Sequence, residues 1–178
     1  CALFFTPNQE RKTYADVRVK KALSLAVDRW GGSKYLSRIA IVKTVGGVVF
    51  PKHPLAATKA ELLKLTGYGT DMGKARAAAK KLLGEAGMSG LKMDFLNRGV
   101  DQPYKVVGTW LVDQWKKVGI SAKQTVKPSG PFYDSLRKKG DFDVSIDFNC
   151  QSVINPIADV TKLLGSAGNN YGNYEDQA

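Results

Sequence analysis

Few side chains in this sequence of 178 residues have the types and spacing that catalysis needs. His53 is the only histidine, and it stands between Pro51 and Pro54 with no cysteine or acid at metal-ligand spacing. Neither a metal site nor a catalytic triad is therefore predicted. Gly67-Tyr68-Gly69 lacks the third glycine and the Lys-Ser/Thr pair of phosphate-binding loops. We expect a protein that is not an enzyme and has no cofactor.

Two carboxylates stand on one face of a predicted strand. Asp143 and Asp147 belong to the segment from Phe142 to Asn149, in which apolar and polar residues alternate. Four residues of extended chain span roughly 13 Å, which is too far for direct acid–base pairing. The pattern predicts polar side chains that face solvent or form hydrogen bonds to a helix.

Several helices are predicted from apolar residues spaced three and four apart. The first runs from an N-cap at Asp16 to a stop at Gly31-Gly32, and another runs from Asp71 to Ala86 before Gly87. The three tryptophans lie on such apolar stripes and are expected in the core, at positions 30, 110 and 115. Tyrosines 68, 171 and 174 fall in loops, where they would either line a small-molecule site or pack on the surface.

Strands and helices alternate along the second half of the chain. The expected order is a strand at 91–95, a helix from Pro103 to Gly119, a strand at 120–126, a helix at 132–139 and the alternating strand. A short strand at 2–5, an irregular strand at 39–50, a short helix at 58–65 and a helix at 156–164 complete the expected elements. This order predicts one α/β domain over residues 1–178, with helices packed on a sheet.

The composition is that of a folded, basic protein. Hydrophobic residues make up 43% and charged residues 24%, and the net charge is +11. Lysines and arginines are spread over the polar faces of several predicted helices, so solvated faces are the simplest interpretation. The alternative is a basic module that binds nucleic acid or another anionic surface, with steep salt dependence. Cys1 and Cys150 could form a disulfide, but the sequence does not show that they meet.

Five segments, in order, resemble the family 5 extracytoplasmic solute-binding proteins, the dipeptide, oligopeptide and nickel receptors of ABC importers. Asp16 to Arg29 resembles the family pattern D-x-R-V-R-x-A-L-x-x-A-I-D-R. The other four are the helix ending in Glu-Ala-Gly at 85–87, the segment 111–120 ending in Gly-Ile, the Gly-Asp-Phe-Asp-Val stretch within 133–144, and the Asn-Asn-x-x-x-Tyr loop at 169–174. Together these segments span nearly the whole chain.

The resemblance implies one lobe of a type II periplasmic binding protein fold, with a mixed sheet flanked by helices. The chain would be the C-terminal lobe of a longer two-lobe receptor, and the N-terminal lobe would be missing. The implied partners are a small-molecule solute, ABC permease subunits and the missing N-terminal lobe, with no nucleic acid. The implied location is periplasmic, or extracytoplasmic and membrane-anchored.

The resemblance also locates the ligand contacts, just after the alternating strand. Peptide receptors of the family have a Trp and then an Asp there, and the matching residues here are Asn149 and Ser152. A buried ammonium without a carboxylate is unfavourable, so a neutral or anionic solute is more compatible. Arg137 precedes this strand and could bind a carboxylate, although it is equally suited to a solvated Arg-Lys-Lys cluster. Because α/β sites gather at the carboxyl ends of strands, the predicted ligand-binding residues are Asn149, Gln151, Ser152, Arg137, Asn97 and Arg98.

Overall fold

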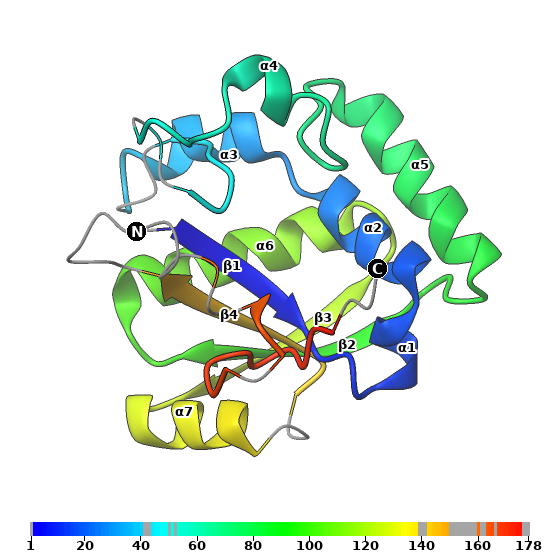
Figure 1. Ribbon diagram of the computed structural model, residues 1–178. Helices are drawn as coiled ribbons and strands as arrows, with labels where there is room; N and C mark the ends of the chain where they lie inside the picture. Colours follow the sequence, from blue (N-terminus) through cyan, green and yellow to red (C-terminus); the bar gives the residue numbers. More distant parts are fainter. Residues whose placement is uncertain are drawn as a thin grey trace.

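A four-stranded mixed sheet forms the centre of the computed structural model, which describes residues 2–40, 44–49, 51, 53–138, 142–149, 160, 163–165 and 167–175. The strands are β1 (Ala2–Pro7), β2 (Lys92–Arg98), β3 (Ser121–Lys127) and β4 (Val144–Asn149). Their order is β1-β4-β2-β3; β2 runs parallel to β3 and β4, and β1 runs antiparallel to β4 (Figure 1). The predicted α/β fold with a mixed sheet is confirmed.

Helices connect and cover these strands. The described helical segments are α1 (Lys12–Ala15), α2 (Val17–Ala26), α3 (Arg29–Leu36), α4 (Lys59–Leu62), α5 (Met72–Glu85), the helical turn η1 (Asp101–Lys105), α6 (Val106–Lys116) and α7 (Ser129–Arg137). The parallel strands are joined by helical crossovers, η1 with α6 between β2 and β3 and α7 between β3 and β4, as βαβ units require.

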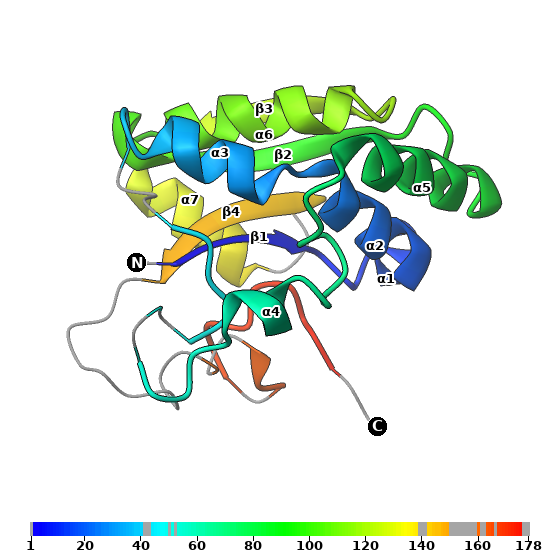
Figure 2. The ribbon, with the colours of Figure 1, turned by 90° about the horizontal axis from the view of Figure 1, so that it is seen from above.

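One face of the sheet packs on α6, with α2 and α5 beyond it (Figure 2). Trp115 of α6 is fully buried, and its ring makes edge contacts with Phe5 of β1 and Phe95 of β2 at centroid distances of 5.7 and 5.0 Å. Its indole Nε1 also donates to the Leu23 carbonyl, which satisfies the one polar atom of this buried ring. Of the three tryptophans expected in the core, only Trp115 is fully buried; those at 30 and 110 are partly exposed.

The opposite face is covered by two different segments. Helix α7 packs on β2 through a small apolar cluster of Leu96, Phe132, Leu136 and Phe142. The described part of residues 163–175 crosses in front of β1 and β4 (Figure 1). Gly172 allows this close approach, because a Cβ there would lie 2.5 Å from Thr6 Cγ2, and its carbonyl accepts the Gln9 backbone N–H at 2.9 Å.

The single helix predicted from residue 16 to residue 30 is wrong. Val27 has an extended backbone, and Asp28 begins the separate helix α3 by accepting the Gly31 N–H at 2.8 Å. Gly31-Gly32 therefore lies inside α3 rather than ending a helix. The close approach of Trp110, which lies 2.2 Å from where a Gly32 Cβ would be, shows that tertiary packing requires a glycine there.

Several smaller expectations differ from the structure. No strand occurs in the described part of residues 39–50. β1 extends two residues beyond the strand expected at 2–5, and Pro103 lies within η1, so that α6 begins at Val106 and not at Pro103. The predicted helix at 156–164 lies almost wholly outside the described residues, as do both cysteines. None of the described helices has the length and apolar character needed to span a bilayer.

Replacing the cap that separates α2 from α3 tests the break between them. We expect Asp28→Ala to lower the free energy of unfolding by about 1 kcal/mol, because the Gly31 N–H loses its acceptor. Urea unfolding followed by circular dichroism measures this change. Asp134→Ala is the control, because this carboxylate is 63% exposed and makes only a surface ion pair. Equal stability of the two variants would contradict a capping role for Asp28.

Candidate ligand-binding site

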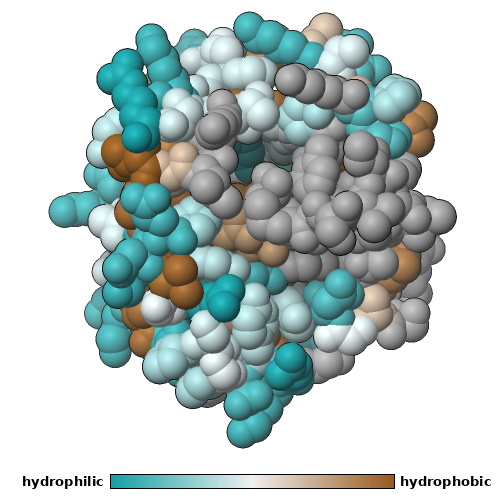
Figure 3. Space-filling model, turned by 90° about the vertical axis from the view of Figure 1, so that its left-hand side faces the viewer, coloured by the Kyte–Doolittle hydropathy of each residue, from teal (hydrophilic) through white to brown (hydrophobic). Residues whose placement is uncertain are grey.

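The carboxyl ends of β2, β3 and β4 meet at one edge of the sheet, because these strands are parallel. This edge, where the β4 arrow ends in Figure 1, faces the viewer in Figure 3. Its surface is hollowed and carries both hydrophilic and hydrophobic residues (Figure 3). Ligands of open α/β sheets bind at such edges, so the polar side chains there are the first candidates for recognition.

Arg98, like Lys127 at the end of β3, is a cation at this edge. It ends β2, and its Nε donates to Ser129 Oγ at 2.8 Å while its Nη1 donates to the Tyr104 hydroxyl at 3.5 Å. The guanidinium lies over the rings of Tyr104 and Tyr133, 5.2 and 5.4 Å from their centroids. The hydrogen bond to Tyr104 raises the pKa of Arg98 above its ordinary value, so the group is always charged. Two rings and a hydroxyl thus fix the direction of a half-buried guanidinium.

Asp147 supplies the opposite charge from β4. Its side chain is only 5% exposed, and its Oδ1 accepts from the hydroxyls of Tyr104 at 3.1 Å and Tyr133 at 3.5 Å. The sequence predicted that this side chain either faces solvent or forms hydrogen bonds to a helix. The second prediction is correct for Asp147, which accepts a hydrogen bond from Tyr133 of α7. Burial is the main cause that raises the pKa of Tyr104, with the Asp147 charge adding to it. The Tyr104 phenol therefore stays protonated near neutral pH and can donate to the carboxylate.

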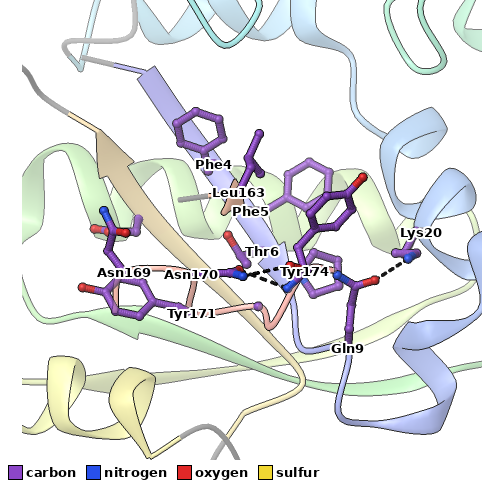
Figure 4. Close-up of a pocket in the computed structure, with 13 residues that line it drawn as sticks. Phe4, Phe5, Thr6, Gln9, Lys20, Leu163, Asn169, Asn170, Tyr171 and Tyr174 are labelled. Atoms are coloured by element: carbon purple, nitrogen blue, oxygen red, sulfur yellow. Dashed lines mark hydrogen bonds between the residues drawn. The ribbon is translucent and has the colours of Figure 1, made fainter. Parts of the chain in front are cut away.

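A pocket of about 150 Å³ opens beside Asp147, on the face of the sheet that carries the Asp147 side chain. Phe4 lies directly opposite Asp147 in the β1–β4 pairing, so the two side chains share that face. Figure 4 shows the pocket between β1 and the C-terminal segment, with Lys20 bonded to Gln9 at one end. The walls include Phe4, Thr6, Leu163, Asn169, Tyr171 and Tyr174.

The loop that carries the two pocket tyrosines is held by Asn170. Its carboxamide donates to the Tyr174 carbonyl at 2.9 Å and accepts the Tyr174 N–H at 3.0 Å (Figure 4). The third loop tyrosine, Tyr68, is not part of this pocket. It instead donates to the Gly46 carbonyl at 3.1 Å and lies against the Arg29 guanidinium, 4.6 Å from its ring centroid.

Asn97, which the sequence analysis assigns to the ligand, serves the fold instead. Its side chain is fully buried, and its Nδ2 donates to the Tyr104 carbonyl at 2.9 Å and to Gln124 Oε1 at 3.1 Å. Its Oδ1 accepts the Arg98 backbone N–H at 2.7 Å. Gly108 of α6 leaves the space for this amide, because a Cβ there would lie 2.1 Å from Asn97 Nδ2. The geometry makes Asn97 a positioning residue for Tyr104 and Arg98.

The remaining predicted residues are only partly described. Arg137 is exposed at the end of α7, where it pairs with Asp134 at 3.5 Å and lies 5.9 Å from the Tyr133 ring centroid. Asn149 ends β4 opposite Ala2, and its side chain is outside the description. Gln151 and Ser152 lie outside the described residues, so their contact with a ligand stays a prediction.

Sequence reasoning missed the three residues that join Arg98 at this edge: Tyr104, Tyr133 and Asp147. Tyr104 and Asp147 are 43 positions apart, and no local pattern links them. One feature of the sequence could have indicated that Asp147 is buried. It stands in a strand rich in apolar residues, and both faces of such a strand can be covered by other elements. Among the described residues, no three His, Cys, Asp or Glu side chains lie close enough to hold a metal ion.

Comparison with known proteins agrees with this architecture. Residues 2–171 match the model of the bacterial extracellular solute-binding proteins, family 5 Middle. The chain belongs to this family. The family resemblance drawn from the five sequence segments is thereby confirmed.

Two family 5 relatives are the periplasmic oligopeptide-binding proteins OppA of Salmonella typhimurium strain LT2 and Escherichia coli K12. They are 27% identical over 185 residues and 26% identical over 184 residues, and each alignment covers all of this chain. The chain spans about a third of the length of these curated relatives, 32% in both cases.

Solved structures show the same fold. The murein tripeptide binding protein MppA of Escherichia coli superposes with a TM-score of 0.79 at 20% identity, covering 98% of this chain and 34% of MppA. Haemophilus influenzae OppA in complex with RPPGFSPFR gives a TM-score of 0.76 at 22% identity, covering 98% of this chain and 34% of that one. The predicted periplasmic binding protein fold is confirmed.

The buried amide of Asn97 gives a stability prediction. Asn97→Ala leaves the Tyr104 carbonyl and Gln124 without a donor, so we expect the free energy of unfolding to fall by about 1–3 kcal/mol. Urea unfolding measures the loss. Lys92→Ala, an exposed change on the same strand, should alter stability by less than about 0.5 kcal/mol. Equal stability of the two variants would show that the amide does not hold this edge.

Alkaline pH tests the buried phenols. Burial raises the pKa of Tyr104 and of Tyr14 above the ordinary value of about 10. Their contribution to stability is fully present below pH ~10 and is lost as the pH rises further, because only the unfolded chain ionises there. We expect Tyr104→Phe to weaken this decline in urea titrations between pH ~8 and ~11. A decline of equal slope in both proteins would contradict the raised pKa.

Proposed function

We propose that this chain forms one lobe, the C-terminal lobe, of a two-lobe receptor that captures a small solute for an ABC importer. The solute is a peptide-like or other organic compound, held in the cleft between this lobe and an N-terminal lobe. Hinge closure over the solute would then present the receptor to the membrane permease. Family membership supports the solute-binding role, and relatives named as periplasmic oligopeptide-binding proteins support a location outside the cytoplasm.

The observation that carries the proposal is the oriented guanidinium of Arg98 at the strand-end edge. Ser129 and two tyrosine rings hold it in place, so little side-chain freedom is lost when a ligand binds. Among the described residues, no carboxylate lies within ion-pair distance of it. A guanidinium in this state favours a planar anionic group, which it can bind through two parallel hydrogen bonds. We therefore infer that the solute presents a carboxylate or a similar anion to Arg98.

The geometry supports binding rather than catalysis. Arg98 and Asp147 at this edge are joined through the Tyr104 phenol, which burial keeps protonated near neutral pH. A nucleophile activated by a neighbouring base would instead need a group whose proton is lost in that range. The basic-module alternative is less favoured, since lysines 81, 105 and 117 pair with carboxylates on their own helical segments.

Replacement of Arg98 in the full-length receptor tests the anionic contact. We expect Arg98→Gln to weaken solute binding about 10- to 100-fold, since a charge-assisted hydrogen bond contributes roughly 1.5–3 kcal/mol. Arg98→Lys should recover part of this loss, because it keeps the charge but not the bidentate geometry. Native mass spectrometry identifies the co-purified solute, and calorimetry with that solute gives the affinities.

Lys81→Gln is the control, because this exposed lysine pairs with Glu85 on its own helix and is not among the predicted ligand-binding residues. It should change solute affinity by less than about threefold, as a surface ion pair contributes little. A full-length receptor with both lobes that retains no small molecule and binds none would refute the receptor role. An unchanged affinity in Arg98→Gln would refute only the contact with Arg98.

A further inference from the structure

The guanidinium of Arg98 is hydrogen-bonded on one side only. An arginine side chain has five N–H groups. The Nε–H donates to Ser129 Oγ at 2.8 Å, and Nη1 donates to the Tyr104 hydroxyl at 3.5 Å, which is at the long limit for a hydrogen bond. Nη2 has no hydrogen-bond partner among the residues that the structure describes. The firm contact is therefore the one at Nε, and the outer end of the group is left for a ligand.

A guanidinium can bind a carboxylate through either of two pairs of parallel N–H groups. We call these the side fork, formed by Nε and Nη2, and the end fork, formed by Nη1 and Nη2. The hydrogen bond to Ser129 occupies the Nε–H and so closes the side fork of Arg98. The long contact with Tyr104 uses one N–H of Nη1, and Nη1 has a second. The end fork is therefore the one that stays open.

The two tyrosine rings hold the guanidinium without using its donors. The central carbon of Arg98 lies 5.2 Å from the ring centroid of Tyr104 and 5.4 Å from that of Tyr133. Aromatic faces attract a cation at this distance electrostatically, with no N–H needed. The rings thus restrict the motion of the group, while the choice between its two forks depends on what binds Nε.

The fold fixes the hydroxyl that binds Nε. Ser129 is the first residue of α7, directly after Pro128, and the first turn closes when the Phe132 N–H donates to the Pro128 carbonyl at 2.9 Å. Phe132 is fully buried in the cluster that packs α7 on β2, so Ser129 is held at a set place beside the strand. The next residue is Gly130, where an added Cβ would meet no atom within 4 Å. The space next to this serine is therefore open to a ligand.

We propose that Ser129 is a positioning residue that decides how Arg98 presents its charge: by holding Nε, it directs the end fork to the solute. The inference rests on the proposed function, since it deepens the contact between Arg98 and an anionic solute. A carboxylate would accept one hydrogen bond at each oxygen from Nη1 and Nη2. The corresponding amide has an NH₂ group in place of one acceptor, so the end fork selects the acid over the amide.

Acetate and acetamide test which fork is used, in the full-length receptor with isotope-labelled arginine and after dialysis to remove bound solute. The NMR signals of Arg98 are those lost in Arg98→Lys. Acetate should shift the Nη signals of Arg98 and leave the Nε–H signal in place, because Ser129 occupies that donor. Acetamide should shift neither. In Ser129→Ala the side fork is open, so acetate should shift the Nε–H signal as well.

The same titrations give affinities. Ser129→Ala should weaken acetate binding about three- to tenfold, the effect of one lost neutral hydrogen bond, and Ser129→Thr, which keeps the hydroxyl, should stay within about twofold of the unaltered receptor. Ser121→Ala is the matched control, because it removes an exposed hydroxyl at the opposite end of the parallel strands. It should leave both the affinity and the pattern of shifts unchanged.

The proposal is overturned if acetate shifts the Nε–H signal of the unaltered receptor, if it fails to shift that signal in Ser129→Ala, or if Ser129→Ala and Ser121→Ala bind acetate equally. Arg98 signals that do not respond to acetate at all would overturn it together with the proposed anionic contact. A receptor that retains and binds no solute, but in which acetate gives the expected shifts, would refute the receptor role and leave the role of Ser129 standing.

Discussion

A carboxylate buried against a sheet must find hydrogen-bond donors, and this requirement organises the functional edge of the protein. Asp147 obtains two phenolic donors, from Tyr104 before α6 and from Tyr133 in α7. The same two rings hold the guanidinium of Arg98. One buried charge thereby joins β2, β4 and two helical segments, because leaving it unpaired in a poorly solvated place would be strongly unfavourable.

The two faces of the sheet differ in composition and packing. The face beneath α6 is apolar and closely packed around Trp115, with contacts that fix β1 and β2 relative to the helices. The other face combines the α7 cluster with polar side chains and an open pocket. A rigid apolar layer on one side gives the charged groups on the other a fixed frame, and recognition by oriented side chains depends on such a frame.

Asn97 shows how closely structure and recognition are coupled at the strand ends. It is buried between the sheet and α6, in space that Gly108 leaves open, and it bonds to the backbone of both Tyr104 and Arg98. Asn97 therefore contacts Arg98, the residue that we propose binds the ligand. The sequence does not show whether an amide near the end of a strand is exposed or buried. In β2 this depends on the register of the strand, which decides which of the strand's two faces packs against the helix.

The sequence by itself determined the elements and their class. Alternation predicted β4, spacing of three and four predicted α2, α5 and α6, and the strand–helix order predicted an α/β domain, because side-chain periodicity depends on local backbone geometry alone. Only the tertiary structure decided that the first helix breaks at Asp28, that Asp147 is buried, and that Tyr104 reaches it across 43 residues. Those outcomes depend on which surfaces pack together, and pairings between distant segments leave no periodic trace in the chain.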